Sequence, residues 1–581
     1  GDDVHRLWMF GLLLVLTLIL VYHPPFPSEL DLYHLGERVT PGIAALQGEA
    51  PYRDVHLQHG LVENALRPAL GFFLFGATLE TEQFGYAAMI ALAYGAFLLL
   101  CLQLFQSRVL ALLLTLVLAC DGFGVAERLT GFLLVLALLA LDLRQARGAD
   151  GSALARTIRW PLRLAGALAA LCLFFSLDTG LYALGCATLF LALESFGRTE
   201  RLARRAVPLL DFWAGVLAGM LPFVLYLAGE QALLAFLQNS WDQLRLQLTL
   251  FGLPFPSVRE IAAPLRSGQV SFGAWLGQPA LLGLLVPAST LALAAVLLRR
   301  SICRSLRRTD YLLLLLVLAQ LLLFRSALGR SDAGHFAYAA ALLWPTLFLL
   351  GESILLAPPP RSRSRLLPRV APVALLALWM VTSHAPLYGL AMHLQRLSHP
   401  SADLPRVPYC RLPLDRAGHV QVPIGQARRI ASLASFIQER LPPGEPLFDF
   451  SNASAIHFLL ERRSPSRFFL AAYAGTEDLQ WELITELERS RPRLVLRDSP
   501  LGVPVLDGDS MEKRLPIVAD YLARTYEPGG RYSFGEILTR RRLKSPVPVT
   551  FSASAQAEPL QPANLAELLR QEIAQSRTRR R

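Results

Sequence analysis

The sequence predicts a polytopic α-helical membrane protein with about eleven transmembrane helices, followed by a small soluble α/β domain. Composition is the first observation: 53% of the 581 residues are hydrophobic, only 17% are charged, and the mean hydropathy is +0.40. A soluble fold cannot bury that much apolar surface. The second is a series of apolar runs of spanning length, and the third is a change to a soluble pattern from about residue 396.

Each predicted span is an apolar run bounded by polar or basic residues. Several are shorter than the ~20 residues of a perpendicular span, so we expect them to extend into flanking residues. The run at 65–79 is left unassigned. The first run is followed by Pro-Pro instead of a small-residue cleavage site, which favours an uncleaved anchor. The predicted spans are 7–23, 83–105, 108–120, 128–143, 163–176, 180–195, 207–228, 273–298, 310–325, 336–356 and 370–392.

Arginine sets the expected orientation, because connections rich in positive charge stay cytoplasmic. Four basic connections, 144–163, 198–205, 299–308 and 361–369, fall on one side of the predicted topology. The N-terminus is then cytoplasmic, and the loops 24–62 and 229–272 lie on the outer face together with everything beyond the last span. The charge of +11 comes almost entirely from arginine, since Lys513 and Lys544 are the two lysines. That bias indicates a GC-rich bacterial genome and argues against a lysine-rich nucleic-acid surface, so no nucleic-acid partner is expected.

The loop 24–62 holds the densest group of acids and imidazoles in the first half of the chain. Ser28, followed three residues later by Asp31, predicts a helix start, and Asp31, His34 and Arg38 then share one face. Gly48 supplies a stop. We expect this helix to lie along a membrane surface.

The same loop resembles the first outer loop of the GT-C superfamily of integral-membrane glycosyltransferases, which includes protein O-mannosyltransferases and lipid A aminoarabinose transferases. The resemblance rests on an acid and an aromatic just beyond the first span (Asp31, Tyr33) and on a small-residue turn before a Pro-Tyr-x-Asp run (Gly48, Pro51, Tyr52, Asp54). It implies a GT-C fold and a glycosyltransferase that takes a sugar from a polyprenyl-phosphate carrier, with inversion, to an extracytoplasmic acceptor: a cell-envelope glycan, a lipid or a protein.

In that superfamily an acid of this loop is the catalytic base, which accepts the proton of the acceptor hydroxyl. The Asp-Glu pair common in relatives is replaced here by Glu29-Leu30-Asp31, so more than one acid qualifies. Asp31 is the first candidate, with Glu29 and Asp54 as the others. The plain structural alternative is that Asp31 is a helix-terminal acid paired with His34 or Arg38.

A departing lipid phosphate also needs fixed positive charge, and a guanidinium group can bind phosphate through two hydrogen bonds. The candidates on the predicted outer face are Arg128, Arg325, Arg330 and His335. The alternative for each arginine is contact with lipid headgroups.

Asp54, His56 and His59 carry ligand chemistry that suits a divalent metal, although histidines in loops more often make ordinary polar contacts. No cofactor or metal site is therefore assigned, and His34, His56 and His59 are predicted to line the cleft. The six cysteines show no ligand spacing.

The expected domains are a membrane domain over 1–395, an extracytoplasmic α/β domain over 396–545 and a tail over 546–581 that is disordered by composition. Within 229–272 we expect an interfacial helix followed by a Pro- and Gly-rich segment suited to cover a cleft, or to form a passive surface loop. The predicted helices of the α/β domain are 425–441, 453–461, 476–490 and 511–525, and its strands are 446–450, 493–497 and 532–540.

Two other functions remain open from the sequence. A transporter or flippase for lipid-linked glycans would show internal repeats and ionisable groups near mid-membrane, and neither pattern is found. A non-enzymatic partner in envelope assembly would use the soluble domain for docking.

Overall fold

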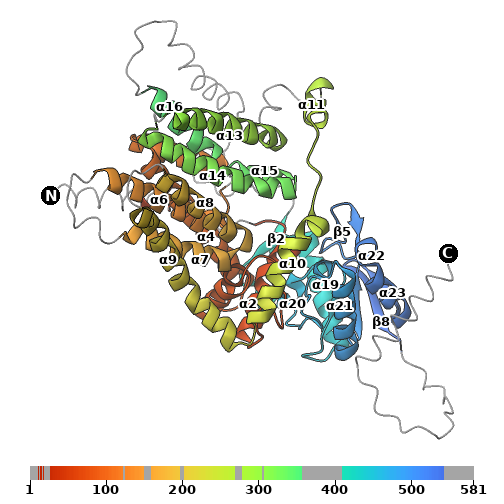
Figure 1. The fold of residues 1–581 in the computed structure, drawn as a ribbon. Helices are drawn as coiled ribbons and strands as arrows, with labels where there is room; N and C mark the ends of the chain where they lie inside the picture. Colours follow the sequence, from red (N-terminus) through yellow and green to blue (C-terminus); the bar gives the residue numbers. More distant parts are fainter. Residues whose placement is uncertain are drawn as a thin grey trace, which may run out of the picture. The chain divides into compact units, whose positions relative to one another are not determined.

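The computed structural model describes residues 27–121, 125–148, 159–196, 202–268, 278–303, 306–355 and 408–541, together with residues 11, 14, 15 and 18 (Figure 1). Several predicted segments lie outside these residues: the span 370–392, most of the span 7–23, the basic connection 361–369 and the tail 546–581. The chain folds as two compact units. Unit 1 comprises Gly1–Pro25, Phe84–Gly229 and Asp242–Leu404, and unit 2 comprises Phe26–Gln83, Glu230–Trp241 and Pro405–Arg581.

The described part of unit 1 is mostly helical. Among the described residues, six helical segments are long and apolar enough to cross a membrane, the last of them interrupted by a turn: Leu79–Leu104, Leu177–Phe196, Arg205–Gly229, Ala280–Ile302, Arg308–Gly329 and Ala333–Ser353. The predicted multi-pass membrane protein with a following α/β domain is confirmed. The helices in chain order are α4 (Leu79–Leu104), α5 (Arg108–Asp121), α6 (Leu129–Gly148), α7 (Trp160–Phe175), α8 (Leu177–Phe196), α9 (Leu202–Gly229), α13 (Pro279–Ile302), α14 (Arg308–Gly329), α15 (Ala333–Ala339) and α16 (Leu343–Leu355).

Small residues let α7 and α9 approach until their backbones touch. A Cβ placed on Gly166 of α7 would lie 2.0 Å from the carbonyl oxygen of Phe212, and one on Gly215 of α9 would lie 2.0 Å from that of Arg163. A Cβ placed on Gly219, one turn further along α9, would lie 2.7 Å from the Cα of Ala167. This is the close small-residue packing by which helices associate where water supplies no driving force.

One predicted span differs from the observed helices, and the unassigned run 65–79 can now be described. The span 336–356 is divided into α15 and α16 by a turn that precedes Pro345. Proline lacks an N–H group and its ring disfavours helical geometry just upstream, so the helix restarts at Leu343. The unassigned run 65–79 contains only the nine-residue helix α3 (Arg67–Phe75), which is too short to span.

Unit 2 is built on a four-stranded sheet with the order β3-β4-β8-β7. Strand β3 (Phe448–Asp449) runs parallel to β4 (Leu494–Arg497), whereas β8 (Gly535–Arg540) is antiparallel to both β4 and β7 (Tyr526–Tyr532). The helices of the C-terminal part are α19 (Ile424–Arg440), α20 (Ala455–Leu459), α21 (Glu477–Ser490), α22 (Met511–Arg514) and α23 (Pro516–Thr525). Two short antiparallel pairs, β1 (Tyr409–Arg411) with β2 (Gln421–Pro423) and β5 (Val505–Leu506) with β6 (Asp509–Ser510), complete the unit.

The predicted α/β elements are confirmed with two corrections. The expected strand 532–540 is the end of a hairpin, because residues 526–532 form a strand of their own. The expected helix 511–525 is broken at Leu515, whose non-helical backbone (φ −124°, ψ 63°) precedes Pro516.

The first predicted outer loop folds with the C-terminal part in unit 2. Helix α2 (Leu32–Leu46) is followed by a π-helix (Leu61–Leu66), and Leu32, Leu35 and Val39 of α2 share one buried core with residues of α19 and α20. A Cβ on Gly36 would lie 1.8 Å from the hydroxyl oxygen of Ser454, so α2 reaches α20 only because this position is glycine. The sequences 27–83 and 408–541 therefore form one folded body.

The predicted interfacial helix is α10 (Leu233–Phe251), and the helix α11 (Val258–Arg266) lies within the segment expected to cover a cleft. Leu234, Leu237 and Trp241 of α10 are 67%, 55% and 64% exposed, which leaves the predicted apolar stripe uncovered by the described chain. The opposite face buries Phe236 and Asn239, and the Asn239 amide donates to the carbonyl of Leu57 at 3.0 Å.

Candidate active site

Asp31 caps helix α2 instead of lying within it, so the predicted start at Ser28 is wrong by three residues. Gln426 explains the shift, because its side-chain amide accepts from the Leu30 N–H at 2.9 Å and donates to the Leu30 carbonyl at 2.8 Å. Both backbone polar groups of Leu30 are thus bonded to a side chain and take no part in the helix. One carboxylate oxygen of Asp31 accepts the N–H groups of Tyr33 and His34, both at 3.1 Å. The predicted stop is confirmed, because α2 ends at Leu46 and Gly48 has a φ of +83°.

The second carboxylate oxygen of Asp31 contacts Nδ1 of His34, as the pattern of helix-face residues predicts. Burial opposes ionisation of Asp31, but the hydrogen bonds and charge of His34 outweigh it and lower the pKa of the carboxyl. The same hydrogen bond raises the pKa of His34 against the opposing effect of burial. Both side chains stay accessible, at 56% and 63% exposed. Asp31 is thus an ionised and reachable carboxylate.

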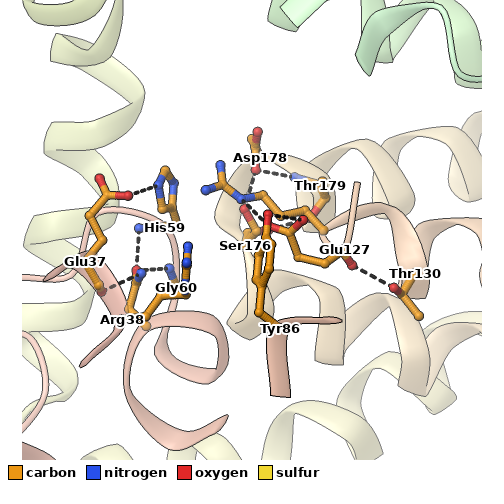
Figure 2. A network of polar contacts seen from close by, with 12 residues as sticks. Glu37, Arg38, His59, Gly60, Tyr86, Glu127, Thr130, Ser176, Asp178 and Thr179 are labelled. Atoms are coloured by element: carbon orange, nitrogen blue, oxygen red, sulfur yellow. Dashed lines mark hydrogen bonds and ion pairs between the residues drawn. The ribbon is translucent and has the colours of Figure 1, made fainter. Parts of the chain in front are cut away.

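Glu37, one and a half turns further along α2, is a buried carboxylate that the sequence analysis did not single out. Its side chain is 5% exposed and lies 3.4 Å from Nε2 of His59 (Figure 2). It also accepts a hydrogen bond from the hydroxyl of Tyr473. Burial opposes its ionisation, yet the charge and hydrogen bond of His59, the charge of His34 and the Tyr473 hydroxyl lower its pKa to about 2. Glu37 therefore carries a full charge inside unit 2 at neutral pH.

Asn64 of the π-helix holds the backbone around this pair in place. Its side-chain oxygen accepts the N–H groups of His59 at 2.9 Å and Gly60 at 3.2 Å, and its side-chain nitrogen donates to the Glu37 carbonyl at 2.9 Å. Figure 2 shows Glu37, Arg38, His59 and Gly60 gathered at this point. The amide fixes the loop that presents His59 to α2.

The helix-face pattern placed Arg38 with Asp31 and His34. In the structure Arg38 binds Glu82 instead. The Arg38 Nε atom lies 2.7 Å from Glu82, and Arg67 donates to both Glu82 oxygens at 2.6 and 3.1 Å. The two guanidinium groups are 12% and 15% exposed, and the carboxylate is 1% exposed. Glu82 is thus bound by two guanidinium groups at once.

The suggested metal ligands are dispersed. Asp54 pairs with Arg53 through two hydrogen bonds of 2.8 and 2.9 Å, whereas His56 is buried against the rings of Phe468 and Tyr473. Burial, with the nearby charge of Arg467, lowers the pKa of His56 to about 3, so this imidazole stays neutral. Within the described ranges, no three His, Cys, Asp or Glu side chains gather as a metal site would require.

The candidate phosphate-binding residues all belong to unit 1. Arg330, at the end of α14, donates to Asp332 at 2.7 Å and to the Phe251 carbonyl at 3.1 Å, and Nδ1 of His335 lies 2.8 Å from Asp332. Arg330, Asp332 and His335 thus form one cluster. Arg330 is 27% and His335 is 37% exposed.

Arg128 and Arg325 have separate partners in unit 1. Arg128 lies 3.9 Å from Glu127, which in turn accepts the hydroxyl of Tyr86 at 3.1 Å (Figure 2). Arg325 makes a side-chain hydrogen bond to Tyr182. The remaining candidate acid, Glu29, is exposed in front of α2.

One weak sequence signal could have found Glu37. Along α2 it stands at helical spacing from Tyr33, Thr40 and Ala44, which are all buried, so the helix has no wide polar face on which this acid could stay solvated. Its partner Tyr473 is 436 residues away along the chain, and no local pattern predicts that contact.

Solved structures of archaeal oligosaccharyltransferases from Archaeoglobus fulgidus resemble this chain. AglB in complex with an inhibitory peptide and a dolichol-phosphate matches at 12% identity with a TM-score of 0.48, covering 90% of this chain and 73% of that one. The enzyme tethered to an acceptor peptide and the apo form match at 11% and 13% identity with TM-scores of 0.44 and 0.46, each covering 93% of this chain and 75% of the other. No protein-family model and no curated protein sequence matches the chain.

Proposed function

We propose that this chain is a membrane glycosyltransferase of the GT-C type, which transfers a sugar from a polyprenyl-phosphate-linked donor to an extracytoplasmic acceptor with inversion at the sugar carbon. The observation that carries the proposal is helix α2, which presents the accessible carboxylate of Asp31 and the buried carboxylate of Glu37 within two turns. Such a helix, joined to a multi-pass membrane bundle, suits a reaction whose donor is a lipid.

Asp31 is the proposed general base. Transfer with inversion needs one carboxylate that takes the proton of the acceptor hydroxyl as the new bond forms. Asp31 is ionised and more than half exposed, so an incoming hydroxyl can reach it, whereas Glu37 is closed in by His59 and Tyr473. Glu29 and Asp54 are the other candidates within the loop, and the ion pair of Asp54 with Arg53 competes with the role.

Guanidinium groups are proposed to stabilise the departing phosphate. Arg330, with His335 beside it, is the main candidate in unit 1, and Arg128 and Arg325 supply further charge. In unit 2, Arg38 and Arg67 are two more guanidinium groups, both paired with Glu82. A dianionic or monoanionic phosphate bound by arginine makes charge-assisted, two-pronged hydrogen bonds.

The proposed setting is a bacterial plasma membrane with the active site on the outer, extracytoplasmic face. The basic connections of the sequence support this orientation. The sugar donor and the membrane lipids are then the partners on the membrane side, and the acceptor comes from the envelope.

The experiment compares Asp31→Asn, Glu29→Gln, Asp54→Asn and Glu37→Gln in purified, monodisperse protein, with donor binding and sugar transfer measured separately on a panel of undecaprenyl-phosphate hexoses. Asp31→Asn keeps size and hydrogen bonding but cannot accept a proton, so transfer should fall ~10²- to 10⁴-fold while donor binding persists. If Asp31→Asn transfers like the parent and another of these variants is inactive, the base is misassigned. If all four remain active, the loop has no catalytic role.

A further inference from the structure

A pocket of about 700 Å³ lies within unit 2, apart from Asp31 and Glu37, neither of which lines it. Its walls are the second half of α2, the segment 49–55 that follows it, and the stretch from α20 to the end of α21. The volume falls within the roughly 300–1,000 Å³ of typical small-molecule sites. The lining is more polar than such sites usually are, which favours a polar ligand.

The charge of the lining is positive. Six guanidinium groups face four carboxylates, an excess of two. The arginines are Arg53, Arg416, Arg462, Arg463, Arg467 and Arg489, and the acids are Glu49, Asp54, Glu461 and Glu486.

Several of these arginines are already engaged. Arg467 pairs with Glu482 at 2.5 Å, and Arg462 donates to the backbone carbonyls of Leu441 and Pro442. Arg463, by contrast, is 64% exposed and lies 3.7 Å from its nearest carboxylate, Glu49, too far for a strong hydrogen bond. Arg489 is exposed in the last turn of α21. Arg463 and Arg489 are thus the cations best placed to take up an anion.

His457 is the second, independent feature of this pocket. It is 3% exposed and lines the pocket, and among the residues that the structure describes neither of its ring nitrogens meets a hydrogen-bond partner, although the backbone of Arg462 comes near the ring. Burial lowers its pKa to about 4, so the imidazole is neutral at physiological pH. A neutral imidazole offers one donor and one acceptor, and a buried polar group left unsatisfied costs free energy that a bound ligand would recover.

We propose that this pocket binds an acidic saccharide, whose hydroxyl groups hydrogen-bond to His457 and whose carboxylate or phosphate is bound by Arg463 and Arg489. A sugar hydroxyl both donates and accepts, as a neutral imidazole does, and an arginine binds either anion in two-pronged fashion. The identification of the ligand as a saccharide rests on the proposed glycosyl transfer, in which this site would hold part of the acceptor glycan.

The test measures equilibrium binding to the full-length protein in nanodiscs, with no donor present. Four probes separate the contributions: trigalacturonate, glucose 6-phosphate, neutral maltotriose and inorganic phosphate. An acidic saccharide should bind at least tenfold more tightly than maltotriose and than inorganic phosphate. The double variant Arg463→Ala/Arg489→Ala should weaken its binding about tenfold or more, since a hydrogen bond to a charged group contributes that much.

Matched variants keep the result interpretable. Arg429→Ala removes an exposed arginine of α19 that does not line the pocket and should leave binding unchanged. His457→Leu should weaken saccharide binding more than His457→Asn, because asparagine retains a donor and an acceptor. The arginine double variant changes accessible side chains and should fold like the parent, as circular dichroism would check.

Three results would overturn the inference: equal binding of maltotriose and trigalacturonate, equal binding of inorganic phosphate and the acidic saccharides, or no loss of binding in the arginine double variant. The proposed function fails separately. Saccharide binding without any sugar transfer by the parent protein would refute the proposed glycosyl transfer and would still support a saccharide-binding pocket. Sugar transfer by a protein that binds none of the four probes would refute the proposed pocket and would still support the glycosyl transfer.

Discussion

Glu37→Gln is expected to destabilise unit 2 by about 3 kcal/mol at pH 7 and to remove part of its pH dependence. The pKa of Glu37 falls from 4.5 to about 2 on folding, which corresponds to about 3 kcal/mol of stabilisation by its surroundings. The amide can still accept from Tyr473, but the attraction to His59 is lost.

The sign of the pH effect follows from the lowered pKa. A depressed carboxyl pKa contributes stability that is complete above pH 4.5 and is lost as the pH falls toward 2. At pH 3.5, one unit below the unfolded value, the parent should have lost about 1.4 kcal/mol from this group alone. The variant should show no such loss, so the difference between parent and variant narrows as the pH falls.

The assay is hydrogen exchange of the α2 amides in increasing urea at pH 7.0, 4.5 and 3.5, expressed as a free energy of opening. Glu29→Gln, an exposed acid just before the same helix, is the control and should lie within about 0.5 kcal/mol of the parent. The reasoning is refuted if Glu37→Gln costs less than about 1 kcal/mol at pH 7, or if parent and variant lose stability in parallel between pH 4.5 and 3.5.

Three further predictions concern packing, phosphate and topology. Gly36→Ala should cost about 3 kcal/mol or more in the α2 opening measurement, because a Cβ there lies 1.8 Å from the Ser454 oxygen, whereas Gly425→Ala meets nothing within 4 Å and should be neutral or mildly stabilising. Arg330→Ala should raise the donor concentration needed for half-maximal transfer more than Arg330→Lys, since lysine keeps the charge but loses the two-pronged geometry; equal, parent-like kinetics would remove this residue from the site. A reporter fused at Ser451 should respond outside the cytoplasm, and a cytoplasmic signal would invert the proposed orientation.

Most helices were predictable because each leaves a strong local pattern. The runs that became α8, α9 and α14 are long, apolar and flanked by charge, and α19 and α21 repeat their apolar residues at helical spacing. Boundaries shifted where proline intervened, as at Pro345 and Pro516.

Strand β7 escaped prediction for a physical reason. Its sequence YEPGGRY contains Pro528, Gly529 and Gly530, which are typical of a turn. The strand survives because it lies at the edge of the sheet, where proline need not donate to a neighbour, and because a bulge between Pro528 and Gly530 absorbs the irregular backbone.

The chemistry of the first loop was only partly predictable. The contact of Asp31 with His34 and the stop at Gly48 follow from local spacing. Burial of Glu37 depends on Tyr473, hundreds of residues away, and the folding of 27–83 with 408–541 depends on a core shared across that distance. A local pattern carries no information on such pairing, and so the more enclosed acid was overlooked.

The central claim is that this protein breaks the bond between a polyprenyl phosphate and its sugar. The most direct measurement supplies an undecaprenyl-phosphate hexose panel and envelope acceptors to the purified protein in nanodiscs, and follows both the release of undecaprenyl phosphate and the anomeric configuration of the product by NMR. The account predicts release with inverted configuration for the parent and almost none for Asp31→Asn. Movement of the intact lipid-linked sugar across the membrane of proteoliposomes, with no release of undecaprenyl phosphate, would contradict it and favour a transporter.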